Sequence, residues 1–233
     1  MTDNQKSKLI NKVESIFGDI SLNELNRSLN GHCFVQQEYA TLFADFGGST
    51  QLIDEYDKMF STWLLKSYLS CVSSLIQHHG GMITAFEGDG LMGVFTGSNK
   101  ESNAVKCAFN IQWTLTNIIQ PKIDELFAKY NYKAYQVVGI DTSELTPIET
   151  EIWDNYDILW IGRSANYSAN LTRINNPKYS TYITNDVFQK LSKELQGNEQ
   201  EIFWDEMSET LNTTKIFRSN RILINNINLN NTL

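Results

Sequence analysis

The chain of 233 residues has few cysteines, few prolines and no long apolar run, and each shortage limits what it can be. Its three cysteines, Cys33, Cys71 and Cys107, are odd in number and have no metal-ligand spacing, which indicates ordinary thiols of a reducing compartment. No apolar stretch reaches the length of a membrane span or of a signal peptide. We therefore expect a cytoplasmic protein without a membrane span.

Positive charge is also scarce. The net charge is −8 and the lysines and arginines form no run, which argues against a nucleic-acid surface. The three histidines, His32, His78 and His79, form neither a metal site nor a catalytic triad pattern. A small anionic ligand held through metal ions is compatible with this composition.

Two glycine-containing segments organise the rest of the chain. The first, TLFADFGGST at residues 41–50, indicates a buried strand that ends on Asp45 and turns through two glycines into a helix. The second, GGMITAFEGDGLMGVF at residues 80–95, is typical of a β-hairpin with Asp89 in its turn. If the hairpin lies beside the first strand, Asp45 and Asp89 meet over one metal site.

The order of the predicted elements indicates the fold class. A helix over 50–79 separates the first strand from the hairpin, and a helix over 102–126, kinked or split by Pro121, leads to a strand at 135–140. This order is an α+β, ferredoxin-like βαββαβ arrangement with the helices on one sheet face.

The remaining segments are expected to extend this unit. We expect a polar loop, a strand, a helix, a strand–helix pair and further strands, at residues 141–155, 158–161, 163–174, 182–195 and 202–224. Helical spacing of apolar residues at 9–17 and a weaker pattern at 22–29 predict an N-terminal helical extension. The expected divisions are an extension, a main domain and a loose tail, at residues 1–36, 37–225 and 226–233.

The segments FADFGGST, GGMITAFEGDGLMGVF, VVGID and GRSANYSAN, in this order, resemble the landmarks of a class III nucleotide cyclase catalytic domain over residues 37–225. The resemblance implies a nucleoside triphosphate substrate and two divalent cations, Mn²⁺ or Mg²⁺, held by Asp45, Asp89 and the carbonyl of Phe46. Such ions assist attack of the ribose 3′-hydroxyl on the α-phosphate, with release of pyrophosphate. The residues that suit the triphosphate are Gly47, Gly48, Ser49 and Thr50.

A structural interpretation of the two aspartates stays open, with Asp45 as a turn or cap residue and Asp89 as a hairpin residue. Metal binding is favoured over it because both occur in one joint pattern.

One position departs from the family. Asn166 matches the asparagine that orients the ribose, but the usual transition-state arginine four residues later is Asn170. An asparagine brings no full positive charge to the α-phosphate. We expect Arg173, or failing that Arg163, to substitute for it; the alternative is that each is an ordinary surface arginine.

The two positions that read the base in this family hold Ala85 and Leu159, which match neither the adenine nor the guanine pattern. The chain resembles the bacterial branch that cyclises UTP or CTP and makes a cyclic pyrimidine signal during phage infection, and we favour UTP. A shift of one or two residues in this matching brings in other side chains, namely Thr84, Glu87, Asp157 and Trp160. Among these, Asp157 would restore an adenine reading.

The resemblance also implies a homodimer whose sites are shared, with Asp45 and Asp89 facing Leu159, Asn166 and Arg173 of the other copy. Three functions stay open at this point: a pyrimidine nucleotide cyclase for antiviral defence, a purine (adenylate) cyclase with altered base contacts, and a nucleotide-binding regulatory domain without activity. Asn170 is the main argument for the third, and the paired aspartates count against it.

Overall fold

The computed structural model describes residues 37–152, 155–174, 176–198 and 201–222, together with 7, 11, 28–29 and 32–33. It separates into two units, one of Met1–Gln36 with Thr146–Leu159 and one of Gln37–Leu145 with Trp160–Leu233. The expected helix at 9–17 and the tail at 226–233 fall outside the described residues, apart from the helical Asn11. The helix expected at 22–29 is wrong at its end, because Ser28–Leu29 (β1) pairs with His32–Cys33 (β2) as a short antiparallel ladder.

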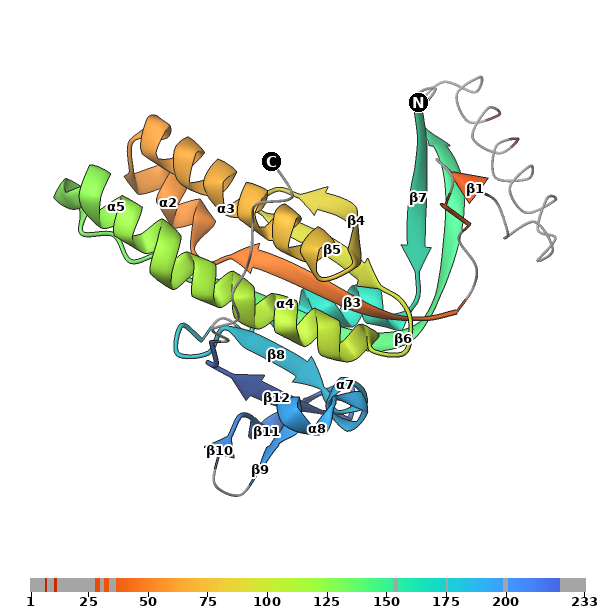
Figure 1. Cartoon of the computed structure of the whole chain (residues 1–233). Coiled ribbons are helices and arrows are strands. Elements are labelled where there is room, and N and C mark those ends of the chain that lie inside the picture. Colours follow the sequence, from red (N-terminus) through yellow and green to blue (C-terminus); the bar gives the residue numbers. More distant parts are fainter. Residues whose placement is uncertain are drawn as a thin grey trace. The chain divides into compact units, whose positions relative to one another are not determined.

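Eight strands of the described residues form one sheet in the order β11-β12-β8-β6-β3-β5-β4, with β7 paired to β6 (Figure 1). Its strands are β3 (Gln37–Phe46), β4 (Gly81–Glu87), β5 (Gly90–Phe95), β6 (Gln136–Ile152), β7 (Asn155–Ile161), β8 (Thr181–Thr184), β11 (Asp205–Leu211) and β12 (Thr214–Ser219). The central order β6-β3-β5-β4 is that of a ferredoxin-like βαββαβ unit, so the predicted fold class is confirmed.

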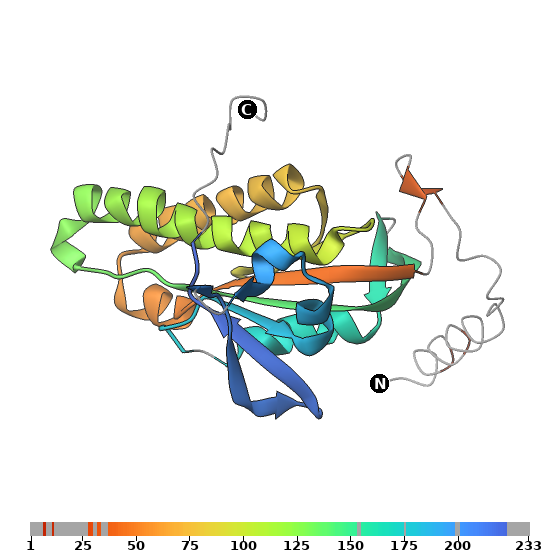
Figure 2. The same cartoon turned by 60° about the horizontal axis from the view of Figure 1, so that its bottom comes forward.

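Helices lie on both sides of this sheet. Figure 2 shows the long helices on one side and the shorter teal helix α6 on the other. The helical segments are α2 (Ser49–Glu55), α3 (Lys58–His78), α4 (Lys100–Thr114), η2 (Leu115–Ile119), α5 (Gln120–Leu126), η3 (Ala128–Tyr130), α6 (Arg163–Thr172), α7 (Asn185–Lys190) and α8 (Lys193–Gln196). A two-residue pair, β9 (Gly197–Asn198) and β10 (Glu201–Ile202), completes the list.

Alternate residues of β3 serve the two faces, as a strand requires. Leu42, Ala44 and Phe46 belong to the main apolar core beneath α3 and α4. Thr41 faces the other way, because its Oγ1 lies 2.9 Å from Oγ of Ser164 in α6. Asp45 therefore projects from the face that α6 covers.

Two expected elements need correction. The helix predicted at 50–79 is two helices, because the chain breaks at Tyr56 and Asp57 restarts it by accepting a hydrogen bond from the Met59 amide at 2.8 Å. The loop predicted at 141–155 is strand instead, since β6 runs to Ile152 and β7 begins at Asn155. The acidic residues and Pro147 of this segment are unfavourable in strands, so the sequence pattern did not indicate that β6 and β7 pair with each other.

The helix predicted at 102–126 is present as α4, the π-helical turn η2 and α5, with Pro121 in the first turn of α5. No helix in the described part of the chain is long and apolar enough to cross a membrane.

Candidate active site

The two aspartates come together at one end of the central strands. Asp45 is the last residue but one of β3 and lies directly opposite Gly90, the first residue of β5. Asp89 precedes Gly90 in the tight β4–β5 turn, where Gly88 has a φ of 64°. A Cβ atom added to Gly90 would lie 3.1 Å from Oδ1 of Asp45, so the glycine leaves room for that carboxylate. The hairpin predicted from the sequence thus carries Asp89 to Asp45.

Each carboxylate affects its surroundings electrostatically. Burial, followed by the charge of Asp89, raises the pKa of Asp45 from 3.8 to about 6. Burial and the charges of both aspartates also raise the pKa of Tyr68, whose side chain is 1% exposed and stands edge-on to Phe46. The Tyr68 hydroxyl has no hydrogen-bond partner among the described residues. The two like charges repel each other, and a cation bound between the carboxylates would relieve this repulsion.

The donor chemistry fits a hard divalent cation. The described residues hold no group of three or more His, Cys, Asp or Glu that would form a full protein cage for a metal. A pair of carboxylates is instead the protein share that Mg²⁺ takes when phosphates and water complete its shell, and Mn²⁺ accepts the same oxygen ligands. Asp45, Asp89 and the Phe46 carbonyl are the residues that would hold such an ion.

The Gly47–Gly48 turn follows the first aspartate. Gly48 has a φ of 73° and caps α2 without a side-chain hydrogen bond, and Ser49 and Thr50 form the first turn of α2. The ring of Tyr135 lies over this turn, since a Cβ added to Gly47 would be 2.0 Å from Cε2 of Tyr135. Sequence reasoning missed Tyr135, because no local pattern marks a tyrosine ahead of the VVGID strand.

Helix α6 carries the other predicted site residues. Asn166 and Arg173 are exposed and Asn170 is partly buried. The opposite side of the helix packs closely on the sheet, because a Cβ added to Gly139 would lie 2.1 Å from the Ser168 carbonyl oxygen. Among the described residues, none of these three makes a hydrogen bond or ion pair with Asp45 or Asp89.

The two candidate arginines differ in their partners. The Arg163 guanidinium donates to both carboxylate oxygens of Asp141, at 3.1 and 3.2 Å, and to the Thr142 carbonyl at 2.8 Å. It also pairs with Asp186. Asp141 is fully buried and accepts a further hydrogen bond from Thr184. Arg173 makes no ion pair with the described residues, whereas the charge of Arg163 is paired with Asp141 and Asp186.

The two positions expected to read the base present small or apolar side chains. Ala85 pairs with Met92 across the β4–β5 ladder, just after a bulge at Thr84. The Thr84 hydroxyl donates to the Met92 carbonyl at 3.2 Å, so it is already used. The Leu159 side chain is 48% exposed.

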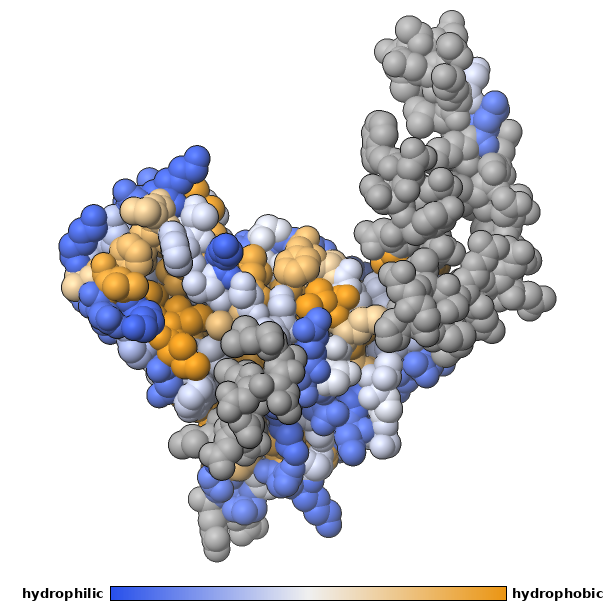
Figure 3. All heavy atoms as spheres, turned by 45° about the horizontal axis from the view of Figure 1, so that its top comes forward, coloured by the Kyte–Doolittle hydropathy of each residue, from blue (hydrophilic) through white to orange (hydrophobic). Residues whose placement is uncertain are grey.

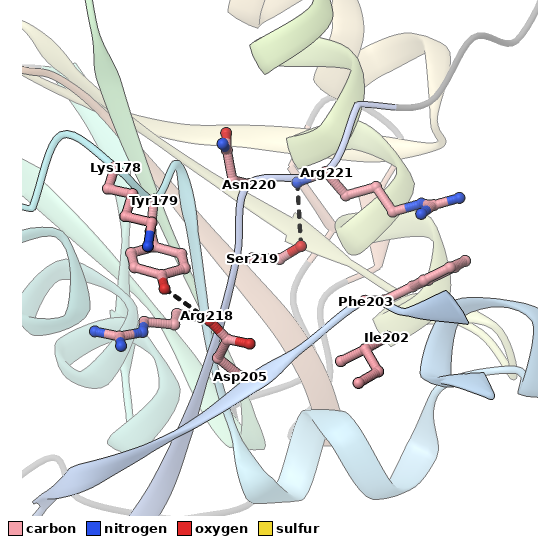
Figure 4. Close-up of a pocket in the computed structure, with 9 residues that line it drawn as sticks. All are labelled: Lys178, Tyr179, Ile202, Phe203, Asp205, Arg218, Ser219, Asn220 and Arg221. Carbon is pink, nitrogen blue, oxygen red and sulfur yellow. Dashed lines mark hydrogen bonds between the residues drawn. The ribbon is translucent and has the colours of Figure 1, made fainter. Parts of the chain in front are cut away.

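A hollow of about 320 Å³ lies elsewhere, on the C-terminal strands (Figure 4). Arg218 lies over the Tyr179 ring at 4.1 Å, and the Tyr179 hydroxyl donates to Asp205 at 2.7 Å. Arg221 lies over the Phe203 ring at 3.6 Å. Figure 4 shows the two guanidinium groups pointing away from each other, so they do not converge on one ligand.

Comparison with known proteins identifies the family. No protein-family model matches the chain. It is 36% identical over 180 residues to the uridylate cyclase of Xanthomonas perforans, covering 77% of both chains. It is 39% identical over 171 residues to that of Burkholderia cepacia, covering 71% of this chain and 73% of the other.

The fold agrees with that identity. The structure of the guanylyl cyclase Cya2 superposes with a TM-score of 0.68 at 15% identity, covering 83% of this chain and 96% of the other. The α+β architecture is therefore that of class III cyclase catalytic domains. The chain belongs to the family of these uridylate cyclases and is a nucleotide cyclase.

Proposed function

We propose that the protein converts UTP to 3′,5′-cyclic UMP and pyrophosphate. The observation that carries this proposal is the pairing of Asp45 with Asp89 in a chain whose relatives at 36% and 39% identity are named uridylate cyclases. A regulatory domain without activity would not need two neighbouring carboxylates, one of which has its pKa raised first by burial and then by the charge of the other.

Asp45, Asp89 and the Phe46 carbonyl would hold the divalent cations, Mn²⁺ or Mg²⁺. When bound, the two cations lower the pKa of the ribose 3′-hydroxyl and neutralise charge on the pyrophosphate. Gly48, Ser49 and Thr50 receive the triphosphate through backbone N–H groups. The expected role of the Gly47 N–H is taken, because it donates to the Tyr135 carbonyl at 2.9 Å. Asn166 orients the ribose.

Arg173 supplies the positive charge that Asn170 lacks. The ion pairs of Arg163 to Asp141 and Asp186 support this choice, because a guanidinium fixed in the fold cannot also reach a phosphate. Arg173 is exposed and has no ion-pair partner among the residues described, so it is free to meet the α-phosphate.

The base site favours a pyrimidine. Ala85 and Leu159 offer no side-chain hydrogen-bonding group to the edge of a purine. A site that reads a base by hydrogen bonds rejects analogues strongly, whereas apolar contacts leave the choice to size and shape. The smaller uracil ring suits such a site.

The active form is a homodimer with sites shared between two copies. Phe86, on the same hairpin as Asp89, is 61% exposed, and Ile161, just before α6, is 54% exposed. Large apolar side chains beside both halves of the site suit burial by a second copy. Figure 3 shows apolar residues among polar ones at the surface of the unit formed by Gln37–Leu145 and Trp160–Leu233.

Mixing two inactive variants tests the shared site. Chains with Asp45→Asn and chains with Asn166→Ala each lack one half, so a mixed dimer regains one complete site. We expect the mixture to recover activity that neither variant has alone. A mixture that stays inactive, or a wild-type enzyme that is monomeric in light scattering under assay conditions, would refute the shared site.

One assay tests the reaction itself. The wild type and Asp45→Asn are incubated with each of the four ribonucleoside triphosphates and Mn²⁺, and the products are identified by mass spectrometry. We expect cyclic UMP from the wild type alone. Cyclic CMP as the main product would change the assigned substrate from UTP to CTP. A cyclic purine nucleotide would overturn the pyrimidine assignment. The absence of any cyclic product would overturn the proposed activity.

We further propose that the product is a second messenger in antiviral defence, as the resemblance to the phage-responsive branch implies. Bacteria expressing the wild type or Asp45→Asn, together with the neighbouring genes of the source organism, are challenged with phage. Fewer plaques on wild-type cells than on the variant are expected, and equal plaque counts across a phage panel would contradict this role.

A further inference from the structure

Tyr135 lies directly on the Gly47–Gly48 turn. Its carbonyl oxygen accepts a hydrogen bond from the Gly47 amide at 2.9 Å, which continues the β3–β6 ladder by one step. A Cβ added to Gly47 would meet three ring atoms of Tyr135, at 2.0, 2.2 and 2.6 Å. Only a glycine allows the ring to rest there, so ring and turn form one unit.

The Tyr135 hydroxyl reaches the second glycine of the turn. A Cβ added to Gly48 would lie 3.3 Å from this oxygen. The side chain is partly exposed, and no hydrogen bond joins its hydroxyl to another residue in the described part of the chain. A phenol carries one donor proton, and here that proton is free for a ligand.

The ring stands on the same face of the sheet as the Asp45 carboxylate. Asp45 is directly opposite Val137, and directly opposed residues project from the same face. Tyr135 is two residues before Val137, so strand alternation returns it to that face. A phosphate chain that starts from a cation on Asp45 would therefore meet the edge of this ring, where its hydroxyl lies beside Gly48.

The segment that carries Tyr135 is held in place before any ligand arrives. The Gln120 side chain donates to the Tyr132 carbonyl at 3.0 Å and accepts from the Ala134 amide at 3.0 Å. Because the donor is already held in place, little conformational entropy is lost when a ligand binds.

We propose that Tyr135 is a substrate-binding residue whose hydroxyl donates a hydrogen bond to the triphosphate beside Gly48, at the start of α2. This inference rests on the proposed function, because it takes a nucleoside triphosphate as the ligand. The phenol supplies a neutral donor beside a pair of carboxylates, and it leaves charge neutralisation to the cations and to Arg173.

The first test removes only the hydroxyl. Tyr135→Phe keeps the ring on Gly47, and the matched control is Tyr132→Phe, whose ring packs edge-on to Tyr56 at 5.1 Å. Calorimetry measures the affinity for inorganic tripolyphosphate with Mn²⁺, and steady-state kinetics give kcat and KM for UTP. We expect Tyr135→Phe to weaken tripolyphosphate binding and to raise KM by about tenfold each, with kcat less affected and the control unchanged.

The possible outcomes separate this inference from the function on which it rests. A wild type that forms cyclic UMP, with a Tyr135→Phe variant equal to it in both affinity and KM, overturns the role of Tyr135 alone. A wild type that binds no tripolyphosphate and forms no cyclic nucleotide overturns the proposed function together with this inference.

A second pair of variants tests the contact between ring and turn. Gly47→Ala should lower the melting temperature, because its methyl group occupies the ring's position. Adding Tyr135→Ala frees that space, so the double variant should regain stability but keep the weak tripolyphosphate binding. A Gly47→Ala protein as stable as the wild type would contradict the geometry on which the inference stands.

Discussion

The Asp45 carboxylate and Gly90 face each other across the β3–β5 ladder, and the missing side chain of Gly90 is what leaves space for the carboxylate. Every proposal about the site depends on this relationship, because Asp89 precedes Gly90 in the same turn. The ladder thus converts a separation of 44 residues in sequence into a pair of neighbouring carboxylates.

Adding a methyl group at Gly90 should disturb both the metal site and the packing of Phe43. In Gly90→Ala the new Cβ would lie 3.1 Å from Asp45 Oδ1 and 2.7 Å from Cε1 of Phe43. We expect Mn²⁺ affinity, measured by electron paramagnetic resonance, to fall about tenfold or more, since the carboxylate must move. Gly97→Ala is a control with open space around its Cβ, although its φ of 84° brings some strain. Equal Mn²⁺ affinity in Gly90→Ala and wild type would contradict this account.

Removing the charge of Asp45 should stabilise the metal-free protein. The pKa of Asp45 is about 6 in the folded protein, above the usual 3.8. Its ionisation therefore lowers the free energy of unfolding as pH rises from about 4 to 6, and the protein stays destabilised by the full amount above pH 6. Asp45→Asn should therefore raise the free energy of unfolding by about 1–3 kcal/mol at pH 8, with little gain at pH 3.5.

Urea unfolding in the presence of a chelator measures the effect at both pH values. Saturating Mn²⁺ should reverse the order, because only the wild type gains from binding the ion. An Asp45→Asn protein less stable than wild type in chelator at pH 8 would show that the carboxylate is not repelled in the free protein.

The two arginines should fail in different ways. Arg173→Ala should lower kcat by about a hundredfold with an unchanged melting temperature, because only transition-state charge stabilisation is lost. Arg163→Ala leaves the buried Asp141 without its cation and should cost about 2–4 kcal/mol of stability. Turnover and thermal unfolding of both variants check this. A fully active Arg173→Ala enzyme would end the proposed role of that residue.

His79 should make stability depend on pH in the acid range. Burial lowers its pKa from 6.5 to about 4, and its Nε2 lies 2.8 Å from Nδ2 of Asn110. The unfolded state binds the proton first as pH falls, so this contribution is present above pH 6.5 and is lost progressively toward pH 4. The loss should reach about 2–3 kcal/mol, and it should be absent in His79→Gln. If the free energy of unfolding changes with pH in the same way in the wild type and in His79→Gln, this pH dependence does not come from His79.

The sequence was most informative where local pattern and contact coincide. The strand ending on Asp45 and the hairpin around Asp89 were both predicted, because apolar runs and glycine turns are local signals. The start of β6 and the end of β7 were also predicted, but the segment between them, expected to be a loop, was missed. Its strand structure comes from the pairing of β6 with β7 rather than from an apolar pattern.

Contacts between distant residues were beyond sequence reasoning. Arg163 meets Asp141 across 22 positions, and nothing nearby marks either residue as the other's partner. Tyr135 meets Gly47 across an even longer separation, and only the ladder between β3 and β6 reveals it. Gly47 looked like a flexible turn, whereas it is the position on which a ring rests.

Anomalous scattering from crystals of the protein with Mn²⁺ and a UTP analogue lacking the 3′-hydroxyl tests the central claim most directly. Manganese peaks within coordination distance of the Asp45 and Asp89 oxygens, with the phosphates of the analogue against them, are the predicted result. A bound analogue whose manganese lies away from both carboxylates would contradict it.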